Sequence, residues 1–408
     1  MKGSYITLAA KDGGTFKAYL AKPEKGSGPG IVLLQEIFGI NQYIRDVADY
    51  YAEEGYVVLA PDLFWRLEPG VELSEAQFEK AFGLYQKFDV PKAAGDIVAS
   101  VAALRAQPEC VGKVGALGFC LGGTLAYLSA AHAGVDCAVG YYGVGIEQML
   151  DLVPKIGCPL VLQFAADDKF VPEAAREQIR SAFAGRQNVE IHVYPGVDHA
   201  FARPGGHAYN KPAALMAHSR SIALFRRVLG PHHDLSALWD AHTYHEFATR
   251  DVDATMATMV AEPYVNHVPT MTGGVGHRDL SRFYRHHFIP TTPADTKLIP
   301  ISRTIGADRV VDEMVFCFTH DIEIDWMLPG LKPSGKYVEI PLVAIVNFRG
   351  PKLYHEHIYW DQASVLVQIG ALDPKGLPVA GIDTAKKLVD ESLPSNGLMK
   401  RWAESASK

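Results

Sequence analysis

The sequence predicts two folded domains, an α/β domain followed by a smaller α+β domain. The chain has 408 residues, and single hydrophobic cores stop growing at about 250–300 residues. Through about the first 230 residues, short apolar runs alternate with helix-like segments, which is typical of a mostly parallel sheet with helices on both faces. Beyond that point long β-type runs follow one another, and this favours an antiparallel sheet.

The composition excludes several classes of protein. Hydrophobic residues make up 48% and charged residues 21% of the chain, which is ordinary for a globular protein. No stretch reaches the roughly 18 apolar residues that a membrane helix needs, and the first residues lack the apolar core of a signal peptide. We therefore expect a cytoplasmic protein that binds no membrane. The net charge of −7, with no long basic run, argues against nucleic acid as a partner.

Six strands are expected in the first domain, each a short apolar run. They lie over residues 30–34, 56–60, 113–117, 137–141, 160–164 and 189–194. Helices are expected over 44–54, 90–106 and 173–183. The last of these begins with Pro172 and Glu173, residue types that favour a helix start.

The GPHHD segment after Leu229 interrupts this alternation, so we place the first domain at 1–230. A single long helix is expected over about 235–260. Long strands are expected over 312–324, 337–348 and 352–362, which places the second domain at 235–373. The remaining residues, 374–408, are expected to form a helical tail.

A candidate nucleophile lies in the GFCLGG segment, residues 118–123, between an expected strand and the helical TLAYLSAAH. This strand–turn–helix context is that of a nucleophile elbow, in which small residues on either side let the helix approach the strand. The usual nucleophile is serine, and here the position holds Cys120. The alternative is a structural role for Cys120 as a buried cysteine in a glycine-rich turn. The five cysteines of the chain are scattered and form no disulfide framework or paired zinc motif.

An acid and a base follow Cys120 in the order of an α/β-hydrolase triad. Asp168 and His199 each come just after an expected strand, where parallel sheets place functional loops. His199 would take the proton of the nucleophile, and Asp168 would fix the imidazole tautomer. Asp167 is an alternative acid. We prefer Asp168 because it holds the fourth position of a G-x-x-D-like turn.

Glu36 follows the first of the expected strands, in QEIFGIN. The loop at this place normally donates one oxyanion-hole amide, so the backbone N–H groups of Ile37 and Leu121 are the candidates. A carboxylate close to Cys120 would raise the pKa of the thiol unless it is itself neutralised. The alternative role of Glu36 is an acid at the start of the next helix.

Together these segments resemble the dienelactone hydrolase (carboxymethylenebutenolidase) family over about residues 5–228. The motifs QEIFGIN, YVVLAPDL, GFCLGG, AVGYYGVG, DKFVP and DHAFAR carry the resemblance. It implies an α/β-hydrolase fold, a Cys120, His199 and Asp168 triad, a thioester acyl-enzyme and no cofactor. It also implies that Glu36 keeps the resting thiol protonated and accepts its proton when substrate disturbs the site. The expected substrate is a small lactone or ester.

The family's substrate is anionic, and the resemblance implies two arginines that hold its carboxylate. Arg203 matches one of them, and its planar fork suits a carboxylate. Phe78 stands at the second position, and Phe82 replaces a tyrosine expected one helical turn later. We therefore expect a lactone or activated ester with a reduced demand for a carboxylate.

The second domain resembles the SnoaL-like branch of the nuclear transport factor two-like superfamily. The carrying motifs are HTYHEFATRDVDATMATMV, YVNHVPTMTGG, SRTIGADRVVDEMVFCFTHD, IDWMLPG and HEHIYWDQASVLVQIG. The resemblance implies a cone-shaped α+β fold with a pocket inside a curved sheet. Such folds host enzymes, binding modules and dimerisation domains. The alternatives are a cyclase or isomerase, which would make the protein bifunctional, a non-catalytic ligand-binding module, and a homodimer interface.

Polar candidates for this second pocket include His267, His355 and Asp361. On a strand, His355 and Asp361 share one face, and Glu356 lies on the other. If the first face meets the pocket, a His/Asp pair there could move a proton at a carbon acid. The alternative is that this face is an outer surface or an interface. No zincin or EF-hand spacing occurs, so we expect no metal. The wider candidate set is His267, His320, His355, His357, Asp325 and Asp361.

Overall fold

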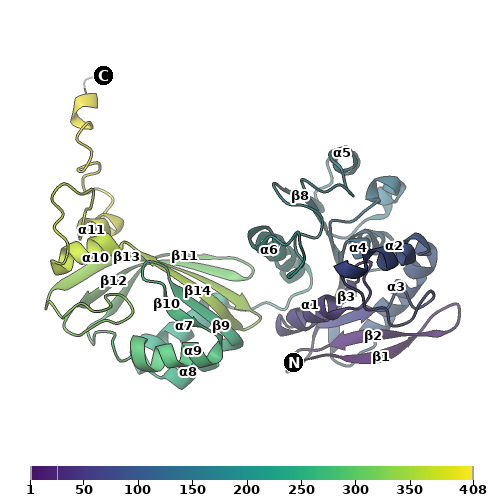
Figure 1. Ribbon diagram of the computed structural model, residues 1–408, viewed down its shortest axis with the longest axis horizontal. Coiled ribbons are helices and arrows are strands. Elements are labelled where there is room, and N and C mark those ends of the chain that lie inside the picture. Colours follow the sequence, from purple (N-terminus) through teal and green to yellow (C-terminus); the bar gives the residue numbers. More distant parts are fainter. Residues whose placement is uncertain (1, 25, 407–408) are drawn as a thin grey trace. The chain divides into compact units, whose positions relative to one another are not determined.

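The computed structural model describes residues 2–24 and 26–406 and divides the chain into two compact units. The first unit is Met1–His232 and the second is His233–Lys408. Each unit has its own sheet and its own hydrophobic core (Figure 1). Among the described residues, no helix has the length and apolar character needed to cross a membrane.

The first unit is built on an eight-stranded sheet with the order β1-β2-β4-β3-β5-β6-β7-β8. The strands from β4 to β8 in this order are parallel, and β1 and β2 add antiparallel pairings at one edge. All six expected strands occur; two have the expected bounds, and the ends of the other four differ by at most three residues. Their bounds are Ser4–Ala9 (β1), Thr15–Ala21 (β2), Gly28–Leu34 (β3), Val57–Pro61 (β4), Cys110–Phe119 (β5), Cys137–Tyr141 (β6), Leu160–Ala165 (β7) and Val189–Tyr194 (β8).

The helices of the first unit begin at side-chain caps. Asn41 accepts a hydrogen bond from the backbone N–H of Ile44, and Asp89 accepts one from Lys92. Such caps satisfy N–H groups that have no partner inside the helix. The helix bounds are Gln42–Glu53 (α1), Phe78–Gln86 (α2), Val90–Arg105 (α3), Leu121–His132 (α4), Glu173–Ala182 (α5) and Lys211–Val228 (α6), and the short turn η1 is Glu75–Gln77.

The second unit contains a six-stranded sheet with the order β10-β9-β14-β13-β12-β11. Neighbouring strands are antiparallel except β14 and β9, which are parallel. The strand bounds are Met259–His267 (β9), Thr272–Val275 (β10), Lys297–Ile305 (β11), Arg309–Thr319 (β12), Tyr337–Arg349 (β13) and Lys352–Trp360 (β14). The helix bounds are Leu235–Thr243 (α7), Val252–Ala257 (α8), Gly276–Phe283 (α9), Gln362–Ile369 (α10) and Asp383–Val389 (α11).

Side chains along β12 alternate between the two faces of the sheet. Met314 and Phe316 join the main core of the second unit together with residues of α7, α8 and α9, helices that gather on one side of the sheet (Figure 1). Val315 and Cys317 point the other way and pack against Ala385 of α11. The sheet is therefore covered on both faces where β12 crosses it.

The expected single helix over 235–260 is wrong. After α7 the chain forms a π-helix, Tyr244–Thr249 (η4), and Arg250 then adopts a left-handed conformation with φ of 54°. Asp251 caps the separate helix α8, and the last two residues of the expected helix belong to β9. The capping aspartate and the left-handed residue before it end one helix and begin another.

Two further boundaries differ from the sequence expectation. The strand expected over 312–324 ends at Thr319, and the strand expected over 352–362 ends at Trp360. The expected helical tail over 374–408 is mostly irregular, with only α11 and the short turn Ala403–Ser405 among its described residues. Its repeated proline and glycine residues explain this, because both disfavour helix interiors.

Candidate active site

Cys120 lies at the turn between β5 and α4 in an uncommon backbone conformation, with φ of 55° and ψ of −118°. A non-glycine residue held in such a region costs on the order of 1–3 kcal/mol and persists only where the surroundings fix it. The backbone N–H of Cys120 donates to the carbonyl of Tyr141 at 3.0 Å, and its own carbonyl accepts from Gly123 at 2.9 Å. These bonds hold the cysteine above the edge of the sheet.

Three glycines make this turn sterically possible. A Cβ atom on Gly118 would lie 1.8 Å from the carbonyl oxygen of Gly122, and one on Gly122 would lie 2.0 Å from that of Leu34. A Cβ on Gly123 would lie 2.3 Å from the carbonyl oxygen of Tyr141. No side chain fits at these distances, so the helix can approach the strands only because these positions carry no Cβ.

His199 and Asp168 form a close pair in the same unit. The Nδ1 atom of His199 lies 2.8 Å from Oδ2 of Asp168. The other oxygen of Asp168 accepts hydrogen bonds from the backbone N–H groups of Phe170 and Val171, at 2.8 and 3.2 Å. The carboxylate is buried, and these bonds orient it. Asp168 rather than the alternative Asp167 therefore reaches the imidazole, as the turn pattern predicts.

The surroundings of His199 favour its charged form. Burial lowers the pKa of the imidazole, but its neighbours Cys120 and Asp168 outweigh burial and raise this pKa to about 10. The rings of Tyr142 and Phe170 lie edge-on to the imidazole, each 5.0 Å from it between centroids. The imidazole is thus clamped in place and can keep a proton that it accepts.

Cys120 and His199 line one cavity of about 350 Å³, a volume within the range of about 300–1,000 Å³ that small-molecule sites show. Both oxyanion-hole candidates line it as well: Ile37 follows β3, and Leu121 is the first residue of α4, whose N–H has no acceptor within the helix. The remaining lining combines seven aromatic or aliphatic side chains with six acidic or basic ones. It consists of Glu36, Phe38, Glu75, Phe78, Phe82, Tyr85, Val144, Lys169, Phe170, Asp198, Ala200, Arg203 and His207.

Arg203 lies in this cavity between two carboxylates. Its Nη1 atom donates to Oε2 of the buried Glu36 at 2.6 Å, and its Nη2 atom pairs with Glu75. Glu75 also lies 3.1 Å from Nδ1 of His207. Arg203 was expected to hold a substrate carboxylate, but both terminal nitrogens of its fork already carry a partner.

Glu36 keeps one oxygen without a hydrogen bond from any described residue. This atom is Oε1, and the side chain is fully buried. Burial raises the pKa of Glu36, and the positive charge of Arg203 opposes that rise only in part. Glu36 therefore combines a raised pKa with a free acceptor atom in the cavity that Cys120 also lines.

Phe78 and Phe82 lie one turn apart on α2 and stack on each other, with ring centroids 5.8 Å apart and an angle of 13° between the planes. Both rings are exposed, at 42% and 38%. They present an apolar surface at the cavity, at the two positions where the sequence departs from the family pattern.

The second unit contains a much smaller cavity of about 40 Å³. His267 lines it, as expected, and its ring packs against Trp326 at 4.8 Å between centroids. Burial lowers the pKa of His267 to about 4, so the ring is neutral near pH 7.

The other two candidates for this cavity, His355 and Asp361, are wrong. The inner face of β14 is the opposite one, so that Glu356 and Ile358 line the cavity instead. Asp361 lies after the strand, where it caps α10 by accepting from the backbone N–H of Ser364 at 3.2 Å. The apolar side chain of Ile358 was the available signal for the inner face.

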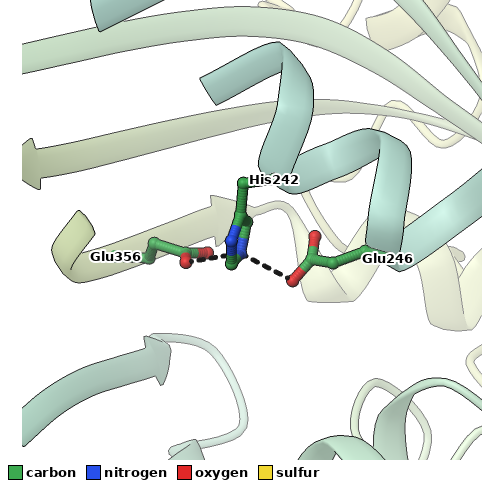
Figure 2. Close-up of side chains that lie close together, drawn as sticks. All are labelled: His242, Glu246 and Glu356. Atoms are coloured by element: carbon green, nitrogen blue, oxygen red, sulfur yellow. Dashed lines mark hydrogen bonds and ion pairs between the residues drawn. The ribbon is translucent and has the colours of Figure 1, made fainter. Parts of the chain in front are cut away.

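One buried polar cluster lies outside the residues predicted from the sequence. It consists of His242, Glu246 and Glu356, which converge from α7, η4 and β14 (Figure 2). The i, i+4 spacing of His242 and Glu246 was visible in the sequence, but the approach of Glu356 depends on the fold.

A mostly parallel sheet with a cysteine at a nucleophile elbow, backed by a paired histidine and aspartate, defines an α/β hydrolase. The model of the dienelactone hydrolase family matches residues 16–229. The chain belongs to this family, and it is an ester or lactone hydrolase.

The chain is similar to two carboxymethylenebutenolidases and to a solved dienelactone hydrolase. A carboxymethylenebutenolidase of Pseudomonas putida is 40% identical over 220 residues, which cover 53% of this chain and 93% of the relative. Carboxymethylenebutenolidase 1 of Cupriavidus pinatubonensis is 36% identical over 229 residues, with coverage of 55% and 97%. A solved dienelactone hydrolase from Anabaena variabilis is 19% identical, covers 56% of this chain and 99% of its own, and has a TM-score of 0.42. The family match ends before the second unit, whose SnoaL-like resemblance stays a prediction.

The glycines of the elbow can be tested by substitution. We expect Gly122→Ala to lower the free energy of unfolding by about 1–3 kcal/mol, the range for overpacking, because its Cβ would meet the carbonyl of Leu34. The measurement is urea unfolding of the full chain. Gly95→Ala on α3 is the matched control, since nothing lies within 4 Å of its Cβ and alanine favours a helix. Equal stability of the Gly122→Ala variant and the wild type would contradict the steric argument.

Proposed function

We propose that the first unit hydrolyses an uncharged lactone or ester through a thioester on Cys120. The single observation that carries this proposal is the shared cavity: Cys120 at the elbow and His199, backed by Asp168, line the same 350 Å³ space. A nucleophile, a base and an orienting acid are the three groups that acyl transfer needs.

In the proposed reaction, the Cys120 sulfur attacks the substrate carbonyl and the thiol proton passes to His199. The backbone N–H groups of Ile37 and Leu121 hold the oxyanion of the tetrahedral intermediate. Collapse breaks the carbon–oxygen bond, and His199 returns the proton to the departing oxygen. Water, deprotonated by His199, then cleaves the thioester and restores the thiol.

Glu36 is proposed as an alternative acceptor for the thiol proton. Its Oε1 atom is free of hydrogen bonds from the described residues, and burial raises its pKa, so the ionised carboxylate is a stronger base than an exposed one. Because Oε2 is bound to Arg203, any substrate group that draws Arg203 away would also release Glu36. This role rests on the family resemblance together with these contacts.

The charges around Arg203 support an uncharged substrate. A free guanidinium would attract a carboxylate, but Glu36 and Glu75 already supply two negative charges to this one cation. A carboxylated substrate must displace at least one of them. The stacked rings of Phe78 and Phe82 offer apolar contact in place of a second cation.

For the second unit we propose a SnoaL-like fold that does not turn over an organic substrate. A six-stranded sheet with helices gathered on its inner face supports the fold (Figure 1). Its cavity of about 40 Å³ is far below the roughly 300 Å³ of small organic sites, which argues against a cyclase or isomerase. A homodimer through this unit remains an expectation, and sedimentation of the full chain would test it.

The nucleophile is tested by Cys120→Ala. We expect this variant to lose at least about 10³-fold in kcat for nitrophenyl esters and neutral lactones, because no other group at the elbow can form the acyl-enzyme. Steady-state kinetics and mass spectrometry of the trapped thioester are the measurements. Cys158→Ala removes a partly buried thiol of the same unit and is expected to keep activity. Equal activity of the Cys120→Ala variant would exclude the thioester route.

The acid is tested by exchanging neighbouring carboxylates. We expect Asp168→Asn to lower kcat by about 10²–10⁴-fold, since the amide favours the wrong imidazole tautomer. Asp167→Asn changes the adjacent residue and is expected to stay within a few-fold of the wild type. Ester hydrolysis measured for both variants decides the assignment, and the reverse ranking would transfer the role to Asp167.

The substrate preference is tested at Glu75. We expect Glu75→Gln to raise kcat/KM for a carboxylated lactone at least about 10-fold relative to its neutral methyl ester, because Nη2 of Arg203 loses its charged partner. Glu79→Gln on the exposed side of α2 removes the same charge without touching Arg203 and serves as the control. An unchanged ratio in the Glu75→Gln variant would show that Glu75 does not set the preference.

A further inference from the structure

The buried cluster of the second unit has the arrangement of ligands around a shared ion. The Nε2 atom of His242 lies 3.1 Å from Oε1 of Glu246 and 3.1 Å from Oε1 of Glu356. All three atoms lie within 4.8 Å of one another, and all three side chains are buried. Figure 2 shows the imidazole between the two carboxylates.

The other nitrogen of His242 fixes the imidazole. Its Nδ1 atom lies 2.6 Å from the hydroxyl of Thr258, and this hydroxyl donates its own proton to the carbonyl of Thr255 at 2.6 Å. The hydroxyl must therefore accept from Nδ1–H. In the neutral imidazole the lone pair then sits on Nε2 and faces both carboxylates. Metal-binding histidines are oriented by such a bond from their second nitrogen.

The protein groups leave part of the cluster unsatisfied. When Nε2 also carries a proton, its single N–H can be donated to only one acceptor, and Glu246 is the residue aligned to accept it. Oε1 of Glu356, whose side chain is 3% exposed, accepts no hydrogen bond from any described residue. No lysine or arginine in the described ranges forms an ion pair with either glutamate. Burying a carboxylate oxygen without such a partner destabilises the folded protein. Oε1 of Glu356 is such an oxygen, and it points into the cluster.

The adjoining cavity is sized for an ion with water rather than for an organic molecule. Glu246 and Glu356 line it, and so does Tyr284, whose hydroxyl lies 3.5 Å from Nε2 of His242. A water molecule needs about 10–15 Å³ of such space. The cavity of about 40 Å³ therefore has room for about three waters beside the three side chains.

The backbone is irregular at the same place. Glu246 lies on the π-helix η4, which directly follows the helix α7 that carries His242. A second π-helix, Tyr284–Phe288 (η5), begins at the tyrosine beside the cluster. π-Helices are rare and occur often at functional sites. Their presence here is a further observation, separate from the side-chain contacts.

We propose that His242, Glu246 and Glu356 bind one divalent transition-metal ion, Zn²⁺ or Mn²⁺, with water at the remaining positions. Ligands about 2.0–2.2 Å from a shared ion lie about 3 Å apart when neighbouring bonds are near a right angle, and the two N–O separations are 3.1 Å. One imidazole nitrogen with two carboxylate oxygens suits this class of metal. Mg²⁺ and Ca²⁺ prefer oxygen ligands throughout.

The test uses the full chain after removal of metal with a chelator. ZnCl₂, MnCl₂ or MgCl₂ is added alone, and bound metal per chain and the melting temperature are measured. We expect one Zn²⁺ or Mn²⁺ per chain and a raised melting temperature, since an ion bound only to the folded form stabilises it. Mg²⁺ at the same concentration is expected to change neither. A wild type that binds Zn²⁺ and Mn²⁺ no better than Mg²⁺ would overturn the proposal.

Variants locate the bound ion. Glu356→Gln keeps the shape of the side chain and is expected to weaken binding at least about 100-fold, because it removes a charged ligand. Cys120→Ala is expected to retain the ion, which excludes binding by the thiol of the first unit. Asp325→Asn changes an exposed carboxylate paired with His287 at 2.8 Å and is the matched control, expected to bind as the wild type does.

A second variant keeps the test decisive if Glu356→Gln does not fold. Thr258→Val leaves all three ligands in place and removes only the acceptor of Nδ1–H, so we expect about 10–100-fold weaker binding with a native circular dichroism spectrum. Wild-type affinity in a folded Glu356→Gln variant would overturn the site. If that variant does not fold, wild-type affinity in Thr258→Val would overturn it instead.

Discussion

The close approach of α4 to the strands below it is the constraint on which the first unit depends. Gly118 and Gly122 each stand where a single added carbon would overlap a backbone carbonyl. Because these two residues have no side chain, α4 can lie close to the strands. This close approach fixes the position of Cys120 above the sheet and the direction of the first N–H groups of α4. The neighbouring strands then bring His199 and Asp168 to the same edge. The chemistry of the cavity therefore begins with van der Waals contact between backbones.

In the cavity over this turn, the polarity depends on Arg203, a cation that two carboxylates share. Arg203 carries one positive charge and meets two carboxylates, one buried and one partly exposed. Burial raises the pKa of Glu36, and the positive charge of Arg203 opposes that rise in part. The exposed rings on α2 complete the cavity with an apolar wall.

The sequence was sufficient for features that depend on local pattern. The alternation of apolar runs predicted the strands of the first unit, and the elbow, Asp168 and His199 follow from motif and order. The pairing of Arg203 with Glu75 was not predictable, because it depends on how η1 folds over the cavity. In the second unit, the unbroken apolar pattern hid the left-handed Arg250 that ends η4. The inner face of β14 was misassigned because polar residues occur on both of its faces.

The parallel pairing of β9 with β14 gives the second unit a particular order of assembly. These strands lie side by side although nearly half of the unit lies between them in the chain. During synthesis the first unit is complete before β9 emerges, so it can fold while the rest is being made. The second unit must instead wait for β14, and only then does Glu356 meet His242 and Glu246. A ribosome stalled after β13 would thus carry a finished hydrolase core beside an open sheet whose central polar residues have not yet been joined.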